Sequence, residues 1–460
     1  MKEIRDPIHG FINPTVEESK IIDTNVFQRL RRIKQLAMAY LVYPGAWHTR
    51  FEHSLGVMHI AGRIAEKLKL DQDLTRIIRL AALLHDIGHG PFSHVSENIL
   101  KLYKDVKSGE DEEIHEKIGW KIIENDPDLV NIIKDQDREM IIDTLSGKLS
   151  EPIAHEIVSG PLDADKQDYL LRDSYFCGVK YGVFDLERLI DTFDKIKDHV
   201  IDKDVLAITS DGIFALEQYI IAKYHMNTQV YRHKVRLVTD AMIVRAIELG
   251  IDEDKIDWLT RLYQNEDTNE YIKNYRKWDD NRLINNLLDP DSKNGYAKNI
   301  FKNLHERKLF KRIYSKSLNE FSDPDLRKYL ESLCDNSKKR EIERHLAEAI
   351  STKLNNVNLD PNLLILQSYK IKSVRTRSSG NEGSIMINKF PNPVNFDNES
   401  TLFRSIDTAE RDSFIEVYAS ISFSDDSDKR NKQSTCEEVI HDYFLNNILS
   451  DLGRRDHEVK

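Results

Sequence analysis

The residues of this chain whose types and spacing could do chemistry are histidines and aspartates beside apolar segments. His85 and Asp86 directly follow the apolar residues 80–84. An imidazole next to an ionised carboxylate is costly to bury without a partner. A divalent cation removes that cost, because neutral histidine and ionised aspartate are among its usual ligands. The pair therefore indicates a metal site.

Two further segments can complete the set of ligands. His53 closes residues 48–53 upstream, and Asp163 and Asp165 lie in residues 162–169 downstream. Taken alone, each residue has a plainer explanation: a chance pair, a hydrogen-bonded core histidine, or a surface carboxylate or helix cap. The combination in this order is much more specific, and it leaves open which of the two aspartates is the ligand.

Histidines after the metal motif suggest proton transfer. His94 and His115 follow it in the chain, and histidine is the natural proton carrier near neutral pH. Glu97 can orient an imidazole. The alternative for both histidines is a solvent-facing position at the start of a helix.

The elements that must position these residues are mostly helices. Apolar spacing predicts helices over residues 54–70, 73–87, 114–125 and 138–145, and over 212–250 either one long helix or two abutting ones. Gly88 is the expected terminator after the second helix. The polar residues 101–113 predict a loop.

The C-terminal part of the chain has a different character. Residues 363–366, 384–387 and 414–418 are expected to be strands, with a Gly/Ser loop at 378–383 joining the first two. An amphipathic helix is expected over 435–452. The fold class is therefore mostly α, with a smaller C-terminal α+β appendage. A basic hairpin (Lys370, Lys372, Arg375, Arg377) is either a contact for a partner or nucleic acid, or a solvated loop.

Composition excludes some classes of protein. The 460 residues carry 67 Lys+Arg and 78 Asp+Glu, a formal charge of −11, so binding of nucleic acid is not favoured. No apolar run is long enough to span a membrane, and the N-terminus has no apolar signal region. The three cysteines form no disulfide or zinc pattern. A reduced, cytoplasmic protein is expected.

Several segments together resemble the HD-domain phosphohydrolases, in particular the branch that contains the sterile-alpha-motif and HD-domain deoxynucleoside triphosphate triphosphohydrolase. The resemblance is firm over residues 1 to about 245, and it is carried by residues 6–10, 27–36, 50–57, 85–94 and 163–173. It implies an HD-type helical core over 1–250, a helical extension over 251–358 and the α+β appendage over 359–460. Because the chain begins directly at the Asp-Pro-Ile-His-Gly element, no sterile-alpha-motif domain is expected before it.

The resemblance also assigns the metal and the acid–base groups. It implies His53, His85, Asp86 and Asp165 as ligands of one divalent transition metal (iron, zinc or manganese), with magnesium or manganese on the triphosphate. Among the catalytic residues it implies His115 as proton donor to the leaving oxygen, His94 as a phosphate-positioning or acid–base partner, Glu97 as an orienting group and Arg50 as a phosphate cation.

The residues expected at the substrate follow from the same resemblance. They are Gln35, Leu36, Lys166, Tyr169, Asp173, Lys223 and Tyr231. Gln35 would bond the 3′-hydroxyl, and Leu36 would place apolar atoms where a ribose 2′-hydroxyl would sit, which disfavours ribonucleotides. The alternative for Leu36 is core packing. Lys223 stands where the family usually has arginine, which alters phosphate recognition because lysine is a point charge.

The regulated relative also implies effector sites for GTP and dNTP that assemble a homotetramer. The matching positions are Lys2, Asp23, Gln28 and Arg31 for one site and Val42, Arg188, His233 and Lys234 for a second. Arg5 replaces a smaller polar residue of that relative, which argues against the second site. Asp23 has the alternative role of a helix N-cap.

The function expected from the resemblance is hydrolysis of dNTP to deoxynucleoside and triphosphate. The resemblance also allows activation of this reaction by GTP or dNTP. Two alternatives stay open at this point. One is an HD-type phosphodiesterase or nuclease acting on single-stranded nucleic acid or a nucleotide second messenger. The other is a nucleotide-sensing scaffold without turnover.

Overall fold

The computed structural model describes residues 3–103, 114–198, 201–264, 268–333, 338–355, 357–370, 385–405 and 413–448. The chain forms two compact units, each assembled from non-consecutive segments. The first contains Met1–His233, Asp257–Pro290 and Val374–Asp407, and the second contains Lys234–Ile256, Asp291–Ser373 and Thr408–Lys460. The predicted fold class is confirmed, since helices predominate and the sheets are small. The division into three consecutive domains stays a prediction.

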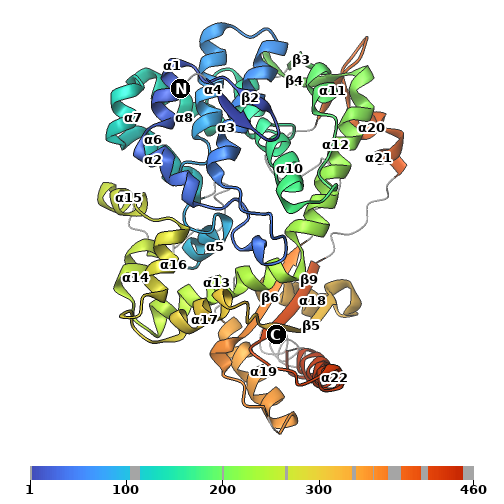
Figure 1. The fold of residues 1–460 in the computed structure, drawn as a ribbon. Coiled ribbons are helices and arrows are strands. Elements are labelled where there is room, and N and C mark those ends of the chain that lie inside the picture. The colour runs from blue at the N-terminus through green and yellow to red at the C-terminus, as the bar shows by residue number, and fades with distance from the viewer. Residues whose placement is uncertain are drawn as a thin grey trace, which may run out of the picture. The chain divides into compact units, whose positions relative to one another are not determined.

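The first unit is a set of packed helices with two small sheets (Figure 1). Its elements up to residue 233 are β1 (Ile4–Asp6), β2 (Gly10–Ile12), α1 (Val16–Ile22), α2 (Asn25–Gln28), α3 (Arg50–Lys67), α4 (Gln72–Leu84), α5 (His94–Tyr103), α6 (Ile114–Asn125), α7 (Pro127–Ile132), α8 (Asp135–Leu145), α9 (Pro152–Ser159), α10 (Ala164–Cys177), α11 (Leu186–Asp191), β3 (Phe193–Asp198), β4 (Lys203–Thr209) and α12 (Ile213–Met226). Its later elements are α14 (Asp257–Tyr263), α15 (Asn269–Tyr275), α16 (Asp280–Leu288), β7 (Met386–Asn388), β8 (Val394–Asn395), α20 (Phe396–Glu399) and α21 (Thr401–Ser405).

Helices α3 and α4 lie side by side in this unit and are almost entirely buried along their apolar positions (Figure 1). Both were predicted as helices, but their predicted ends were wrong. Helix α3 begins at Arg50 because the Glu52 carboxylate accepts a hydrogen bond from the Thr49 N–H at 3.0 Å and caps the first turn. Helix α4 ends at Leu84, so His85 and Asp86 lie in the turn that follows it.

Gly88 does not terminate a helix, contrary to the prediction. It lies in the turn after α4, where a Cβ atom would stand 2.0 Å from the His115 carbonyl oxygen and 2.4 Å from the Gly119 nitrogen. The backbones of the turn and of α6 therefore approach each other more closely than any side chain at residue 88 allows. This contact joins the turn that carries His85 and Asp86 to the start of α6, where His115 lies.

Other helices compare with the prediction as follows. Helix α6 spans the predicted residues 114–125, and α8 starts at Asp135 rather than at residue 138. Residues 212–250 form two helices, α12 and α13 (Lys234–Asp252), with a π-helical turn at Asn227–Tyr231 between them. The predicted loop at 101–113 is wrong for residues 101–103, which belong to α5, while 104–113 lie outside the described residues.

One predicted C-terminal strand belongs to the first unit. Strand β7 pairs in parallel with β4, with Ala207 opposite Met386, in a sheet of order β3-β4-β7-β8. The strand prediction at 384–387 is thus confirmed from residue 386 onward, but its partner is β4 rather than the strand at 363–366. The Gly/Ser loop at 378–383, and the basic hairpin beyond Lys370, fall outside the described residues.

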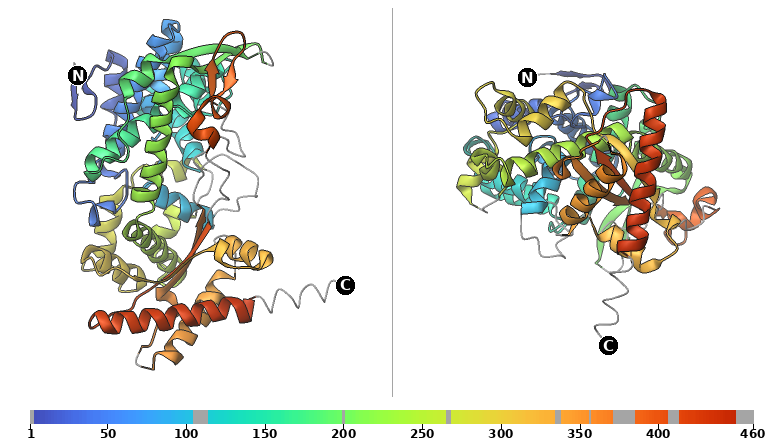
Figure 2. Two further views of the ribbon diagram at one scale, coloured as in Figure 1. Left: turned by 90° about the vertical axis from the view of Figure 1, so that its right-hand side faces the viewer. Right: turned by 90° about the horizontal axis from the view of Figure 1, so that it is seen from below.

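The second unit is an α+β assembly. Its elements are α13, α17 (Tyr296–His305), β5 (Lys311–Ser317), α18 (Pro324–Ser332), α19 (Lys339–Lys353), β6 (Leu364–Lys370), β9 (Ser413–Ala419) and α22 (Asp426–Tyr443). Strand β9 lies between β5 and β6, antiparallel to both, and α19 and α22 pack with the sheet around one apolar core (Figure 2). The strand predictions near 363–366 and 414–418 are confirmed.

The predicted start of the last helix was wrong. Helix α22 begins at Asp426, because the Asp425 carboxylate accepts hydrogen bonds from the N–H groups of Ser427 (2.8 Å) and Asp428 (2.9 Å). Residues after 448 lie outside the described residues. Within the described residues, no helix has the length and apolarity needed to cross a membrane.

The close approach at Gly88 can be tested by adding one methyl group. Gly88→Ala is expected to lower the free energy of unfolding by about 1–3 kcal/mol, because its Cβ overlaps backbone atoms that cannot rotate away. Urea-induced unfolding measures the change. Gly119→Ala is the matched control: its Cβ meets the Gly88 nitrogen at 3.5 Å, an ordinary contact. Equal stabilities of the two variants would contradict this account.

Candidate metal centre

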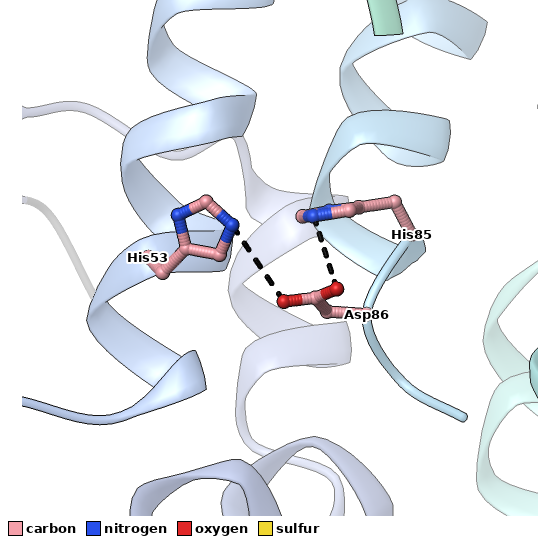
Figure 3. A group of neighbouring side chains, drawn as sticks. All are labelled: His53, His85 and Asp86. Carbon is pink, nitrogen blue, oxygen red and sulfur yellow. Dashed lines mark ion pairs between the residues drawn. The ribbon is translucent and has the colours of Figure 1, made fainter. Parts of the chain in front are cut away.

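His53, His85 and Asp86 form a compact group of possible metal ligands (Figure 3). His53 comes from the first turns of α3, and the other two come from the turn after α4. The Asp86 carboxylate lies 3.6 Å from His53 Nε2 and 3.3 Å from His85 Nε2. One ligand atom from each residue lies within 4.8 Å of the others, so the group could hold one divalent ion.

Each imidazole is oriented by a hydrogen bond at Nδ1, the ring nitrogen that faces away from the ligand group. His85 Nδ1 is 2.8 Å from the Ala82 carbonyl oxygen, and His53 Nδ1 is 2.8 Å from Asp168 Oδ2. Protons on both Nδ1 atoms leave the Nε2 lone pairs for a ligand. His85 Nε2 is buried and has no hydrogen-bond partner among the described residues. In their neutral forms, the two imidazoles together with the Asp86 carboxylate suit a divalent transition metal.

The structure separates the two candidate aspartates on α10. Asp165 Oδ1 lies 2.9 Å from His53 Nε2 and 3.7 Å from His85 Nε2. Asp163 is the N-cap of α10, and its oxygens accept from the Lys166 N–H at 2.7 Å and the Lys166 Nζ at 2.6 Å. The geometry therefore brings Asp165, and not Asp163, to the histidines.

Electrostatics favour an ionised Asp86 beside basic histidines. The Arg50 guanidinium donates to Asp86 Oδ2 at 2.5 Å. Burial would raise the pKa of Asp86, but Arg50 and His85 outweigh it and hold that pKa well below its usual range. Burial likewise opposes a charge on His53, but hydrogen bonds to Asp165 and Asp168 outweigh it and raise the pKa of His53 to about 10.

A network behind the ligands was missed by the sequence analysis. Asp168 is fully buried and is bonded by His53, by His9 Nε2 at 2.6 Å, and by the Arg172 guanidinium at 2.8 and 2.9 Å. Arg172 also donates to Asp6 Oδ2 at 2.8 Å. The signals in the sequence were residues 6–10 and 163–173, which were noted for the resemblance, but Asp6, His9, Asp168 and Arg172 were given no role.

The predicted acid–base residues do come together. His115 Nδ1 lies 2.7 Å from Glu97 Oε2, and His94 Nδ1 lies 3.9 Å from the same oxygen. These partners outweigh burial and keep the pKa of Glu97 well below its usual range. His115 is mostly buried, whereas the His94 side chain is 61% exposed.

His89, which the sequence analysis did not single out, joins this group to the metal ligands. Its ring stacks on that of His115 at 3.9 Å, and its Nε2 lies 3.3 Å from Asp86 Oδ1. Burial, Arg50 and His115 lower the pKa of His89 well below its usual range, so it is neutral. In the sequence, the one sign that His89 lies near the ligands was its place in the segment 85–94, which carries the resemblance.

Gln35, Asp173 and Tyr231, which are expected at the sugar, are linked by hydrogen bonds through His48. His48 Nε2 lies 2.7 Å from Asp173 Oδ1, and Tyr231 OH donates to Asp173 Oδ2 at 2.7 Å. The His48 carbonyl accepts from the Gln35 N–H at 3.1 Å, and the ring of Tyr169 lies edge-on to that of Tyr231 at 6.0 Å. Leu36 is buried in a small apolar cluster against which Tyr231 packs, which agrees with the core-packing alternative as well.

The remaining predicted residues are not linked to the ligand group by a described hydrogen bond or ion pair. Lys166 is bonded to Asp163, and Lys223 is half-buried on α12. Asp23 follows α1 as its C-cap and Thr24 is the N-cap of α2, so the N-cap alternative for Asp23 was wrong.

Gln28 accepts from Arg31 Nε at 2.8 Å, and the Arg31 guanidinium lies 3.4 Å from the centre of the Phe51 ring. Arg188 pairs with Asp211 at 2.8 Å, and the ring of His233 meets Tyr43. Val42 ends a short 3-10 helix, and Lys234 opens α13 in the second unit. Lys2 lies outside the described residues. The effector assignments stay predictions.

Comparisons with known proteins agree with this geometry. The profile of the HD domain matches residues 50–165, and that of the HD associated region matches residues 184–433. An uncharacterized protein of Methanocaldococcus jannaschii is 44% identical over 263 residues, which are 56% of this chain and 51% of that protein. A deoxynucleoside triphosphate triphosphohydrolase SAMHD1 homolog of Dictyostelium discoideum is 33% identical over 328 residues, 67% of this chain and 59% of that protein.

A solved structure is similar over nearly the whole chain. The crystal structure of a phosphohydrolase from Bacteroides thetaiotaomicron has a TM-score of 0.70 at 26% identity, and the match covers 91% of this chain and 99% of that one. The chain spans about half the length of the first curated relatives it matches, 51% and 55%.

Metal binding is expected to displace a proton from His53. With a pKa of about 10, His53 is protonated at pH 8 in the metal-free protein, and its Nε2 must lose the proton to become a ligand. Calorimetric titration with Mn²⁺ or Zn²⁺ in buffers of different ionisation enthalpy should show about one proton released per ion. The apparent affinity should rise with pH between 7 and 9, by at most about tenfold per unit.

Two variants control this measurement. His85→Ala should weaken metal binding by at least about tenfold. His94→Ala, at the exposed start of α5 and outside the ligand group, should bind the metal as the wild type does. A pH-independent affinity without proton release, or an unchanged affinity in His85→Ala, would overturn the ligand assignment.

Proposed function

The chain belongs to the family of HD-domain proteins with an HD-associated region, and on this premise we propose that it is a metal-dependent dNTP triphosphohydrolase. The reaction converts dNTP and water to deoxynucleoside and inorganic triphosphate. The observation that carries the proposal is the ligand group His53, His85 and Asp86, with Asp165 beside it and Arg50 paired to Asp86. The similarity to the Dictyostelium deoxynucleoside triphosphate triphosphohydrolase homolog supports this substrate class.

The metal site fits hydrolysis of a phosphoester. A divalent cation held there by His53, His85, Asp86 and Asp165 supplies Lewis acidity to a phosphoryl oxygen and to water. The sequence and the donor set suit iron, zinc or manganese, and the triphosphate itself would carry magnesium or manganese. Asp168 keeps His53 in the tautomer that this site requires.

The guanidinium beside the ligands fits a triphosphate. Arg50 uses Nε and Nη1 on Ser93 and Asp86, and its Nη2 is buried without a partner among the described residues. A guanidinium with one uncommitted amine is suited to a phosphate oxygen. We assign Lys166 and Lys223 to the same triphosphate.

His115 is the proposed proton donor. Its Nδ1 is held by Glu97 at 2.7 Å, and the ionised Glu97 stabilises the imidazolium. Water forms the new bond to the α-phosphorus, the bond from phosphorus to the 5′-oxygen breaks, and His115 Nε2 protonates that oxygen. His94, on the exposed side of Glu97, positions phosphate.

The sugar is assigned to Gln35, Leu36, Tyr169, Asp173 and Tyr231. Gln35 Oε1 is buried and has no partner among the described residues, so it can accept from a 3′-hydroxyl. Leu36 offers apolar atoms, against which an additional 2′-hydroxyl would lose its hydrogen bonds with water. This arrangement favours deoxynucleotides over ribonucleotides.

We further propose that GTP and dNTP act as effectors of a homotetramer, through a site at Lys2, Asp23, Gln28 and Arg31. The pairing of Gln28 with Arg31 supports this site. An amide beside a guanidinium can bond a guanine edge and a phosphate together.

Product analysis tests the proposed reaction. Purified protein with Mn²⁺ or Mg²⁺ should release triphosphate and deoxynucleoside from dNTP, alone or in mixtures that include GTP, and should act weakly on rNTP. The double variant His85→Ala/Asp86→Ala should lose at least about 100-fold in rate. His305→Ala, at an exposed position of the second unit, is the control that should keep full activity. Cleavage of single-stranded nucleic acid with every dNTP mixture inert would refute the proposal.

A further inference from the structure

Asp280 is a fully buried carboxylate that joins two distant segments of the first unit. It is the first residue of α16, inside the HD-associated region. Its Oδ1 accepts from the Phe92 N–H at 2.7 Å, and its Oδ2 accepts from the Lys34 N–H at 3.0 Å. The Lys34 ammonium lies 3.9 Å away. Burial raises the pKa of Asp280 to about 6, so the group is still ionised at neutral pH.

The segment that Asp280 holds is strained. Phe92 and Ser93 have φ angles of +63° and +58°, a region that residues with a Cβ rarely adopt. Each such residue costs about 1–2 kcal/mol and persists only where surrounding contacts determine it. The hydrogen bond from Phe92 to Asp280 is a contact of this kind.

Ser93 passes this constraint on to Arg50. Its hydroxyl donates to the Lys34 carbonyl at 2.7 Å and accepts from Arg50 Nε at 2.8 Å. Lys34 is therefore held at both of its backbone groups: its N–H donates to Asp280, and its carbonyl accepts from the Ser93 hydroxyl. The orientation of the Arg50 guanidinium, and of its uncommitted Nη2, depends on where Ser93 is held.

The same part of the HD-associated region contacts the turn after Asp86. Tyr275 OH donates to the Gly88 carbonyl at 3.2 Å. Arg29 is fully buried and donates from Nε to the Trp278 carbonyl at 2.8 Å and from Nη1 to the Ile87 carbonyl at 3.2 Å. Residues 257–290 thus contact the metal-binding turn and the Arg50 support at several backbone positions.

We infer that Asp280 is a positioning residue for the phosphate site, acting through Phe92, Lys34 and Ser93 on Arg50. The inference rests on the proposed role of Arg50 as the phosphate cation, and it gives the HD-associated region a part in binding the triphosphate. The contacts of Asp280 are to Phe92 and Lys34 and not to a proposed metal ligand, so its loss should weaken phosphate binding and leave metal binding intact.

The matched pair Asp280→Asn and Asp279→Asn tests this inference. Asparagine at 280 has the same shape, but its amide nitrogen would face one of the two N–H donors. Asp279 pairs with the exposed Arg32 and caps α16 by accepting from the Arg282 N–H at 2.9 Å, a role that asparagine can keep. Among the described residues, neither carboxylate oxygen of Asp279 accepts a hydrogen bond from the loop around Phe92.

The probe is inorganic tripolyphosphate, titrated into Mn²⁺-loaded protein. Asp280→Asn should bind it at least about tenfold more weakly than wild type, with unchanged Mn²⁺ content and affinity, and Asp279→Asn should match wild type. Ser93→Ala should show the same loss, and combining it with Asp280→Asn should add little, because both act through one contact to Arg50.

Several outcomes would overturn the inference. One is that Asp280→Asn and Asp279→Asn bind tripolyphosphate equally well. Another is that Arg50→Ala binds it as tightly as the wild type does. If Asp280→Asn does not fold, wild-type affinity of Ser93→Ala would also overturn the inference. A wild type that binds tripolyphosphate through Arg50 and Asp280 but hydrolyses no dNTP would refute the proposed substrate and support the inference. The two failures are therefore distinguishable.

Discussion

Burial of charge where β1, α3 and α10 meet is the constraint on which the first unit depends. Asp6, Arg172, Asp168 and His53 form a chain of alternating charge, and every one of these side chains is buried. A buried carboxylate without partners would be prohibitively costly, so each of these groups fixes the next. Gly56 permits this arrangement, since a Cβ there would stand 1.9 Å from Asp168 Oδ1. His53 consequently reaches the metal site in one orientation.

The HD-associated region contributes to this site as well as to the second unit. Its residues 257–290 belong to the first unit, and Tyr275 and Asp280 bond the backbone of the metal-binding turn and the loop after it. The Trp278 carbonyl accepts from Arg29, which also donates to the Ile87 carbonyl in that turn. The strained backbone at Phe92 and Ser93 is retained because these contacts determine it. The site is therefore a product of both family regions, and its chemistry depends on segments that are far apart in the sequence.

Local patterns predicted several of the helices and the His85–Asp86 pair, while the full set of ligands was proposed from the family resemblance. Apolar spacing located α3, α4 and α6, and the His-Asp pair after an apolar run located the metal-binding turn. Helix ends were predicted less well, because Glu52 and Asp425 cap through contacts that spacing does not show. Asp168, Arg172 and Asp280 were missed, or noted without this role, because their partners are distant in the chain. The pairing of β7 with β4 was missed for the same reason.

The central claim, that this buried His-Asp site directs water to the α-phosphorus of a dNTP, is tested most directly by a single turnover in H₂¹⁸O. Mass spectrometry of the products then locates the label. Attack at phosphorus with departure of the 5′-oxygen predicts one ¹⁸O in the triphosphate and none in the deoxynucleoside. Label in the deoxynucleoside, or release of nucleoside monophosphate and pyrophosphate in place of triphosphate, would contradict the account.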